Sequence, residues 1–139
     1  MALKTLVLFS LLVLGLLVIV GAQPSAFYTF QNRHMDPGSG PFGPLYCNRT
    51  MNRRNLLNRN FNTFVHESPD DVKDVCKERN YTCKNGQTNC HKSRNRMSIS
   101  DCSITGRNPI NYQTTNSRKY IIIACDPTGV WPVHFDDSM

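Results

Sequence analysis

The longest run of apolar residues lies at the amino terminus, whereas later apolar positions come in short, spaced groups. Residues 6–20 are apolar apart from one serine and one glycine, Lys4 precedes them, and Gly21 and Ala22 follow. A cationic start, a short apolar stretch and a small-residue end are typical of a secretory signal peptide, and a membrane span needs roughly 20 apolar residues. We therefore expect a signal peptide at residues 1–22, with cleavage as late as residue 26 left open.

Helical spacing begins directly after this segment. Phe27, Phe30 and His34 recur at intervals of three and four, which predicts a short helix over residues 27–35. Glycine and proline then crowd residues 36–44, which predicts an exposed loop.

Two further short helices are expected. One covers residues 45–55. The other begins at Ser68, which can serve as N-cap because Pro69 and two aspartates follow it, and ends near residue 79.

The remaining pattern is typical of strands. Residues 60–66 alternate in polarity, and Asn85-Gly86 is a turn signal. Further strands are expected at residues 97–102, 112–115, 119–125 and 130–135. Helices precede strands without a βα alternation, so the predicted class is α+β with an antiparallel sheet, in one domain over residues 23–139.

Cysteine usage favours disulfides over metal. The domain keeps six cysteines: Cys47, Cys76, Cys83, Cys90, Cys102 and Cys125. An even count in a short secreted chain predicts a disulfide framework, for which six cysteines allow 15 pairings. Because no CxxC spacing occurs and secretion disfavours free thiolates, we expect no metal site. We also expect no cofactor.

Charge suggests a class of partner. The chain has a net charge of +6. Without the signal segment, 15 basic side chains oppose 10 acidic ones. This excess makes polyanions plausible partners but does not identify one.

Five segments resemble the pancreatic ribonuclease (ribonuclease A) family. They are RHMD at 33–36, NTFVHES at 62–68, CKNGQTNC at 83–90, MSISDC at 97–102 and PVHFD at 132–136. The resemblance covers essentially the whole chain, and CKNGQTNC together with PVHFD is highly specific. It implies three short helices packed on a V-shaped antiparallel sheet.

The resemblance also implies a disulfide pattern. Cys47 should pair with Cys102, Cys76 with Cys125, and Cys83 with Cys90. Family members usually have a fourth bridge, and here both of its cysteines are absent, near residues 58–59 and 110–111.

The reaction that the resemblance implies uses the nucleophile that RNA itself carries, the ribose 2′-hydroxyl. His34 would be the general base and His134 the general acid, because imidazoles can exchange protons near neutral pH. Asp136, two residues beyond His134, could orient its imidazole. DNA lacks the 2′-hydroxyl and should not be cut.

The phosphate-binding cation departs from the family pattern. An ungapped match places Arg59 where the family has a lysine, although a deletion of that lysine is an alternative alignment. Arginine keeps the charge, but its planar guanidinium does not reproduce an ammonium. Arg33 replaces the usual glutamine before the base histidine and could contact phosphate. We therefore expect reduced activity.

Other substrate contacts follow by matching positions. Thr63 corresponds to the residue that reads a pyrimidine, Phe135 to the aromatic beside that base, and Lys84 to a lysine near a neighbouring phosphate. Further matches are Ser138 beside the first base and Gln87, Asn89 and Asp126 in the pocket for the base on the 3′ side.

Several residues are expected to lie outside the site. His66 and His91 are interpreted as structural or solvent-facing, and the arginines at 53–54 and 94–96 as solvated faces that help to attract RNA. Asn48 and Asn80 begin glycosylation sequons.

The sequence thus leaves two functions open. One is a secreted, monomeric, pyrimidine-preferring endoribonuclease without a membrane anchor, to which ribonuclease inhibitor is a candidate partner. The other is a catalytically weak or inactive cationic secreted protein with a role in host defence or in receptor or glycan binding.

Overall fold

A computed structural model describes residues 22–139, so the expected signal peptide lies outside the described residues except at its last position. Within this range, no helix is long and apolar enough to cross a membrane. The helices are α2 (Ser25–His34), α3 (Tyr46–Arg53), α4 (Pro69–Asp74) and the 3₁₀-helix η1 (Val75–Lys77).

The three predicted helices are present, but the third is shorter than expected. Ser68 is its N-cap, as predicted, because the Ser68 hydroxyl accepts a hydrogen bond from the Asp71 amide at 3.1 Å. The α-helix ends at Asp74, continues as η1 and becomes extended at Glu78. Helical structure therefore ends at Lys77, close to the expected end near residue 79, but its last turn is a 3₁₀-helix and not α-helix.

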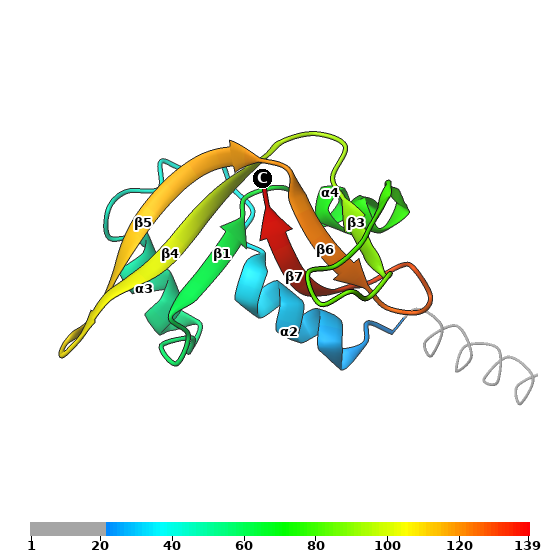
Figure 1. The fold of residues 1–139 in the computed structure, drawn as a ribbon. Coiled ribbons are helices and arrows are strands. Elements are labelled where there is room, and N and C mark those ends of the chain that lie inside the picture. Colours follow the sequence, from blue (N-terminus) through cyan, green and yellow to red (C-terminus); the bar gives the residue numbers. More distant parts are fainter. Residues whose placement is uncertain (1–21) are drawn as a thin grey trace, which may run out of the picture.

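Two antiparallel sheets form the body of the protein. One has the order β1-β4-β5 and the other β2-β3-β6-β7. Their strands are β1 (Phe61–Val65), β2 (Asn80–Tyr81), β3 (Cys90–Lys92), β4 (Met97–Arg107), β5 (Ile110–Lys119), β6 (Ile121–Cys125) and β7 (Pro132–Ser138). Only Tyr120 separates β5 from β6, so the sheets meet there and diverge as the two limbs of a V (Figure 1).

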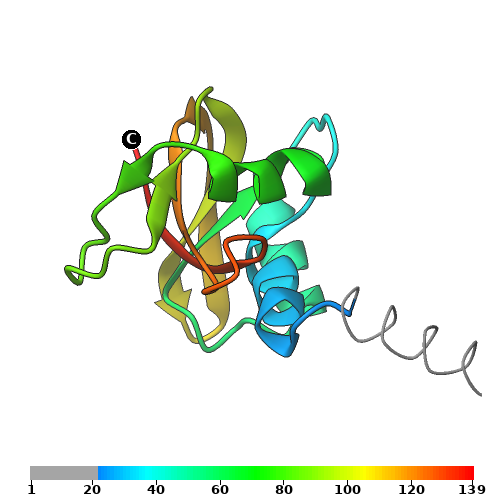
Figure 2. The same ribbon diagram turned by 90° about the vertical axis from the view of Figure 1, so that its right-hand side faces the viewer.

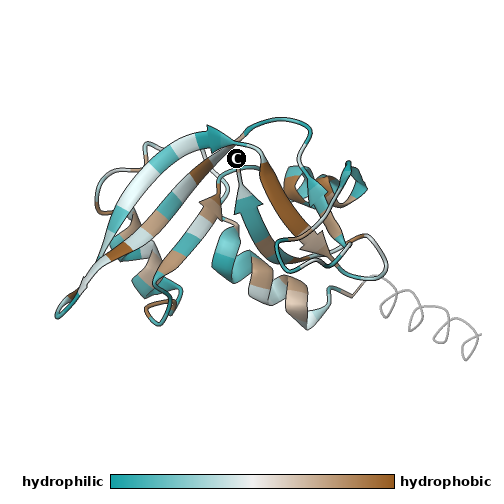
Figure 3. Cartoon of the chain, viewed as in Figure 1, coloured by the Kyte–Doolittle hydropathy of each residue, from teal (hydrophilic) through white to brown (hydrophobic). Residues whose placement is uncertain are grey.

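The predicted strands at residues 97–102 and 112–115 are too short. In the structure β4 and β5 form a long hairpin that reaches well beyond the buried part of the sheet. Figure 3 shows why the pattern was weak: β5 is largely hydrophilic, whereas β6 is strongly hydrophobic. The sequence also missed β2 and β3, which are too short to alternate.

We call β1-β4-β5 with α3 the first arm, and β2-β3-β6-β7 with α4 and η1 the second arm. Helix α2 packs against both β1 and β7 and so joins the arms. Helices α2 and α3 lie on the same side of the strands (Figure 2). The largest core cluster includes Phe27 and Phe30 of α2, Ile99 of β4, and Ile121 and Ile123 of β6.

All three implied disulfides are confirmed. Cys47 pairs with Cys102 in the first arm, whereas Cys76–Cys125 and Cys83–Cys90 are both in the second arm. The predicted fold class, with helices on a V-shaped antiparallel sheet, is likewise confirmed.

Candidate active site

His34 is the last residue of α2, and its side chain is buried at the junction of the arms. Its Nδ1 lies 2.9 Å from the carbonyl oxygen of Thr63 in β1. A carbonyl can only accept, so Nδ1 carries the proton and Nε2 is left with a free lone pair. The ring also packs against Phe135 of β7, with ring centroids 5.3 Å apart.

Burial changes the protonation of His34. It lowers the pKa of the imidazole to about 3, although the hydrogen bond to Thr63 opposes this shift. The positive charges of Arg59, Arg33 and His134 lower the pKa further. The ring is therefore neutral near pH 7 and can accept a proton.

His134 lies on β7, and its side chain is 58% exposed. Its Nε2 lies 3.2 Å from Oδ1 of Asp136, whose carboxylate is almost buried. The second carboxylate oxygen of Asp136 accepts a hydrogen bond from the Lys84 amide at 3.0 Å. Asp136 therefore contacts the imidazole as the sequence predicted, and Nδ1 of His134 is left for another partner.

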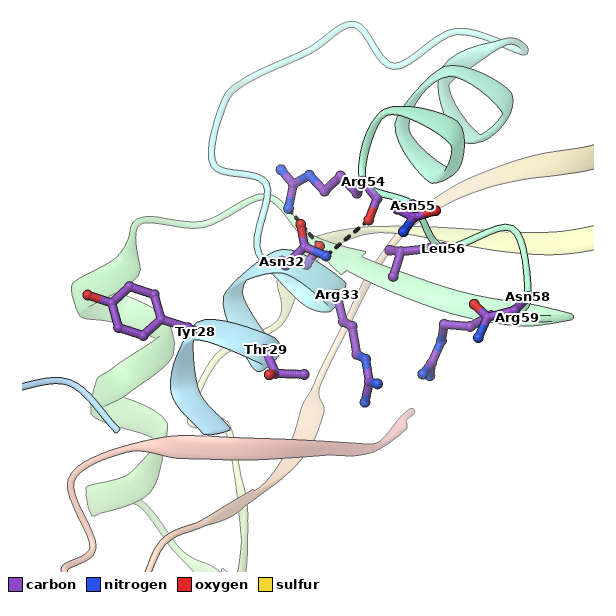
Figure 4. Close-up of a pocket in the computed structure, with 9 residues that line it drawn as sticks. All are labelled: Tyr28, Thr29, Asn32, Arg33, Arg54, Asn55, Leu56, Asn58 and Arg59. Carbon is purple, nitrogen blue, oxygen red and sulfur yellow. Dashed lines mark hydrogen bonds between the residues drawn. The ribbon is translucent and has the colours of Figure 1, made fainter. Parts of the chain in front are cut away.

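Arg59 and Arg33 face one another across a polar pocket of about 410 Å³ (Figure 4). No acidic residue lines this pocket. Burial and the neighbouring Arg33 charge both lower the pKa of Arg59, and its buried Nε has no hydrogen-bond partner among the described residues. Two like charges without a counterion are an arrangement that an anion would stabilise.

A smaller pocket of about 190 Å³ adjoins this one, because Arg59 lines both. It brings together seven of the predicted site residues, namely His34, Arg59, Thr63, Lys84, Phe135, Asp136 and Ser138. The Thr63 hydroxyl donates to Asp101 at 2.7 Å, and Lys84 forms an ion pair with Asp137 at 3.3 Å.

The residues expected to hold the second base lie apart from both pockets. Oδ1 of Asp126 accepts hydrogen bonds from Thr128, Val130 and Trp131 of its own turn. Burial acts to raise the pKa of Asp126, but these hydrogen bonds outweigh it and hold the pKa below its usual value. Asn89 donates to the Cys125 carbonyl at 3.1 Å, and the Gln87 carbonyl accepts from the Cys83 amide.

The interpretation of Arg54 as a solvated cation is wrong. Its side chain is 18% exposed and forms an ion pair with Asp36 at 3.0 Å. A run of two arginines at the end of a helix carries no signal that separates a surface cation from an inward-facing one. Arg53 is exposed, as expected.

His66 is structural, in agreement with the prediction. Its Nε2 lies 2.6 Å from the Ser100 hydroxyl, its Nδ1 lies 2.7 Å from the Asp36 carbonyl, and its ring stacks on Phe42. His91 Nδ1 contacts the Glu78 carbonyl at 3.0 Å.

Sequence reasoning missed Asn62, Asp101 and Asp137, which contribute to the site. Asn62 is buried and donates to the Arg33 carbonyl at 2.7 Å. Alternation could not reveal it, because β1 is buried on both faces from Asn62 onward. Among residues 22–139, no group of three or more His, Cys, Asp or Glu side chains is placed to hold a metal ion.

Comparison with known proteins agrees with this geometry. The pancreatic ribonuclease family model matches residues 25–136. The chain is 47% identical to a pancreatic ribonuclease of Lemur catta over 98% of its length and 95% of that protein's. It is 48% identical to a brain ribonuclease of Bos taurus, over 100% of its own length and 90% of that protein's. The predicted resemblance is thus confirmed: this chain belongs to the pancreatic ribonuclease family.

Proposed function

We propose that this protein is a secreted endoribonuclease that cleaves single-stranded RNA on the 3′ side of pyrimidines. The observation that carries the proposal is a pocket lined by the buried, neutral His34, by Arg59 and by Asp136. Asp136 in turn contacts the exposed His134, which lines neither pocket itself but is close enough for its charge to lower the pKa of His34. Cleavage of a phosphodiester by the neighbouring 2′-hydroxyl needs a base, an acid and positive charge, and these groups supply all three.

The proton transfers can be written atom by atom. Nε2 of His34 takes the 2′-hydroxyl proton as that oxygen attacks phosphorus, and protonated His134 gives a proton from Nδ1 to the departing 5′-oxygen. The product is a 2′,3′-cyclic phosphate. Water then opens this ring with the two roles reversed. Asp136 contacts His134 at Nε2 and so orients its ring with Nδ1 toward the leaving oxygen.

Arg59 and Arg33 are proposed to bind the phosphate whose charge increases in the transition state. Their guanidinium groups converge, and neither has a carboxylate partner in the pocket that they share. Loss of one preorganised donor of this kind costs about 10²–10³ in rate. Because Arg59 stands in a lysine position, a lower rate than that of lysine-containing relatives is part of the proposal.

Base recognition is assigned to Thr63 and Phe135, and the neighbouring phosphate to Lys84. Thr63 and Phe135 enclose the same small pocket as His34, which brings the base site next to the reacting ribose. The Thr63 hydroxyl is oriented by Asp101. Ser138 lines this pocket too. Asn89 and Asp126 would take part only if their side-chain hydrogen bonds were exchanged for a base, whereas Gln87 is exposed and uses only its backbone in the hydrogen bonds described for residues 22–139.

A dinucleotide assay tests the proposal. Cytidine- and uridine-containing dinucleotides should give the cyclic phosphate, and their 2′-deoxy counterparts should not react. His134→Ala should lower kcat by about 10²–10⁴, and Arg59→Gln by about 10²–10³. A wild-type rate equal to that of His134→Ala would contradict the enzyme proposal and leave the cationic binding protein as the better one.

Secretion and glycosylation belong to the same proposal. Protein sequencing of the secreted chain should begin at Gln23. Of the two sequons, Asn80 is exposed on an edge strand. The Asn48 side chain is already engaged: its Nδ2 donates to the Asn111 side chain, and its Oδ1 accepts from the Tyr112 backbone N–H. A glycan is therefore expected at Asn80, which mass spectrometry of the secreted protein and of Asn80→Gln would test.

A further inference from the structure

Arg54 lies directly after α3, and its guanidinium reaches the last turn of α2. Nη1 lies 3.1 Å from the carbonyl of Gln31, 3.0 Å from that of Asn32 and 2.7 Å from that of Met35. The last carbonyls of a helix have no partner inside the helix and form its negative end. The Gln31 carbonyl already accepts a hydrogen bond from the Met35 amide, so the guanidinium adds a second donor there, and through all three contacts it complements the negative end of α2.

Arg54 is itself held from three directions. Its Nη2 pairs with Asp36 at 3.0 Å, and the Tyr46 hydroxyl donates to the other oxygen of that carboxylate at 2.5 Å. The Asn32 side chain donates back to the Arg54 carbonyl at 3.1 Å (Figure 4). The guanidinium also lies over the Phe64 ring, 5.4 Å from its centroid. These contacts fix the Arg54 side chain in one conformation.

The turn that Arg54 holds is the one that carries His34 and Arg33. We propose that Arg54 is a positioning residue, which fixes the last turn of α2 so that Arg33 faces the larger pocket and His34 the smaller one that adjoins it. The proposal rests on the proposed roles of those two residues. On the other side of the turn, the same task falls to the Thr63 carbonyl and to Asn62. Arg54 also lines the larger pocket, but its guanidinium is bound to Asp36 and to the carbonyls of α2, so this scheme gives it no substrate contact.

The competing explanation is that Arg54 contributes only positive charge. A lysine at this position keeps the charge but cannot place one planar donor group between three carbonyls and a carboxylate. Arg49 of α3 is the matched control, because it is exposed and its side chain takes part in no hydrogen bond or ion pair recorded for residues 22–139. Arg54→Lys and Arg49→Lys thus make the same chemical change, once at an arginine whose guanidinium is hydrogen-bonded and once at an arginine whose guanidinium is not.

The first measurement is steady-state cleavage of a pyrimidine dinucleotide. Arg54→Lys should lower kcat about tenfold or more with KM within about twofold, because a small misplacement of a reacting group mainly affects the chemical step. Arg49→Lys should match the wild type. Equal kcat values for Arg54→Lys, Arg49→Lys and the wild type would overturn the proposal.

The second measurement does not depend on activity. NMR titration of the His34 ring protons should show its pKa rising from about 3 toward 6.5 in Arg54→Lys, as water reaches the loosened turn. If Arg54→Lys does not fold, Asn32→Ala takes its place, because it removes only the return hydrogen bond from an exposed position. An unchanged His34 titration there would also overturn the proposal. A wild type without ribonuclease activity would end the proposed function, yet the titration would still decide the role of Arg54.

Discussion

The two arms of the molecule are cross-linked in different ways, although both contribute residues to the candidate site. The second arm carries two of the three disulfides, Cys76–Cys125 and Cys83–Cys90. The first arm carries only Cys47–Cys102, and the bridge absent relative to the usual family pattern would have joined residues near 58–59 to residues near 110–111, both in this arm. His134 and Lys84 thus stand on the more cross-linked arm, and Arg59 on the less cross-linked one.

Hydrogen bonds hold the Arg59 segment where a covalent bridge is absent. The hydroxyl of Tyr112, from β5, donates to the Arg59 carbonyl at 2.6 Å. The Ile104 amide donates to the Asn60 carbonyl at 2.8 Å, and the Arg107 guanidinium donates to the Asn60 side chain. These three hydrogen bonds tie the Arg59 segment to β4 and β5 where the usual cross-link is missing.

The arms differ in charge as well. Residues 37–66, which supply α3 and β1 of the first arm, contain four arginines and no acidic residue. The second arm contains the acids of α4 together with Asp126, Asp136 and Asp137. The cations proposed to bind phosphate are Arg59 of the first arm, Arg33 of α2 and Lys84 of the second arm. The carboxylates that contact His134 and Lys84 both come from the second arm.

Of the two bridges in the second arm, Cys76–Cys125 should contribute more to stability than Cys83–Cys90. Loss of a native disulfide from a small secreted domain costs about 2–5 kcal/mol, and more when the closed loop is longer. This bridge spans 49 residues and Cys83–Cys90 spans 7. Denaturant unfolding should therefore show a greater loss for the Cys76→Ser, Cys125→Ser pair than for the Cys83→Ser, Cys90→Ser pair. Equal losses would show that loop length is not what distinguishes the bridges.

Acidification should weaken the junction between the arms. The pKa of His34 is about 3 in the folded protein and 6.5 when exposed, and burial also lowers the pKa of His66. Between pH 3 and pH 6.5 the unfolded chain binds more protons at His34 than the folded protein does. The contribution of neutral His34 to stability is therefore fully present above about pH 6.5. It falls as the pH is lowered, by up to about 1.4 kcal/mol per pH unit. Urea titrations from pH 7 to pH 5 would measure this slope. His34→Asn should reduce the slope, and a flat wild-type profile would contradict the prediction.

The sequence predicted helices from their local residue spacing, and the fold class and disulfides from the family resemblance. Helix spacing placed Phe27, Phe30 and His34 on one face, which is buried in the structure. The N-cap at Ser68 could be recognised from that serine and the proline and two aspartates that follow it. The edge strands β2 and β3 were not predictable, because strands of two or three residues are stabilised by their neighbours rather than by their own pattern. The fold class and the disulfides followed from the resemblance.

The contacts that assemble the site lay beyond local patterns. Arg54 reaches a helix that ends twenty residues earlier, and Tyr112 holds a carbonyl 53 residues away. Both are tertiary contacts of side chains whose sequence neighbours look like ordinary surface positions. The Asp136 contact with His134 was predictable because residues two apart on a strand share a face.

Removal of the Tyr112 hydrogen bond should have the smallest effect on stability among these tests of the difference between the arms. Tyr112 is 2% exposed, so Tyr112→Phe removes one buried hydrogen bond and keeps the ring packing. The expected loss of stability is about 0.5–1.5 kcal/mol. Tyr81→Phe in the second arm is the matched control, because Tyr81 is exposed and its hydroxyl lies 4.0 Å from the Met139 sulfur. Thermal unfolding should separate the two variants, and dinucleotide cleavage should fall only for Tyr112→Phe, because the freed carbonyl belongs to Arg59. If both variants unfold and cleave alike, the first arm does not rely on this hydrogen bond to hold its proposed phosphate-binding cation.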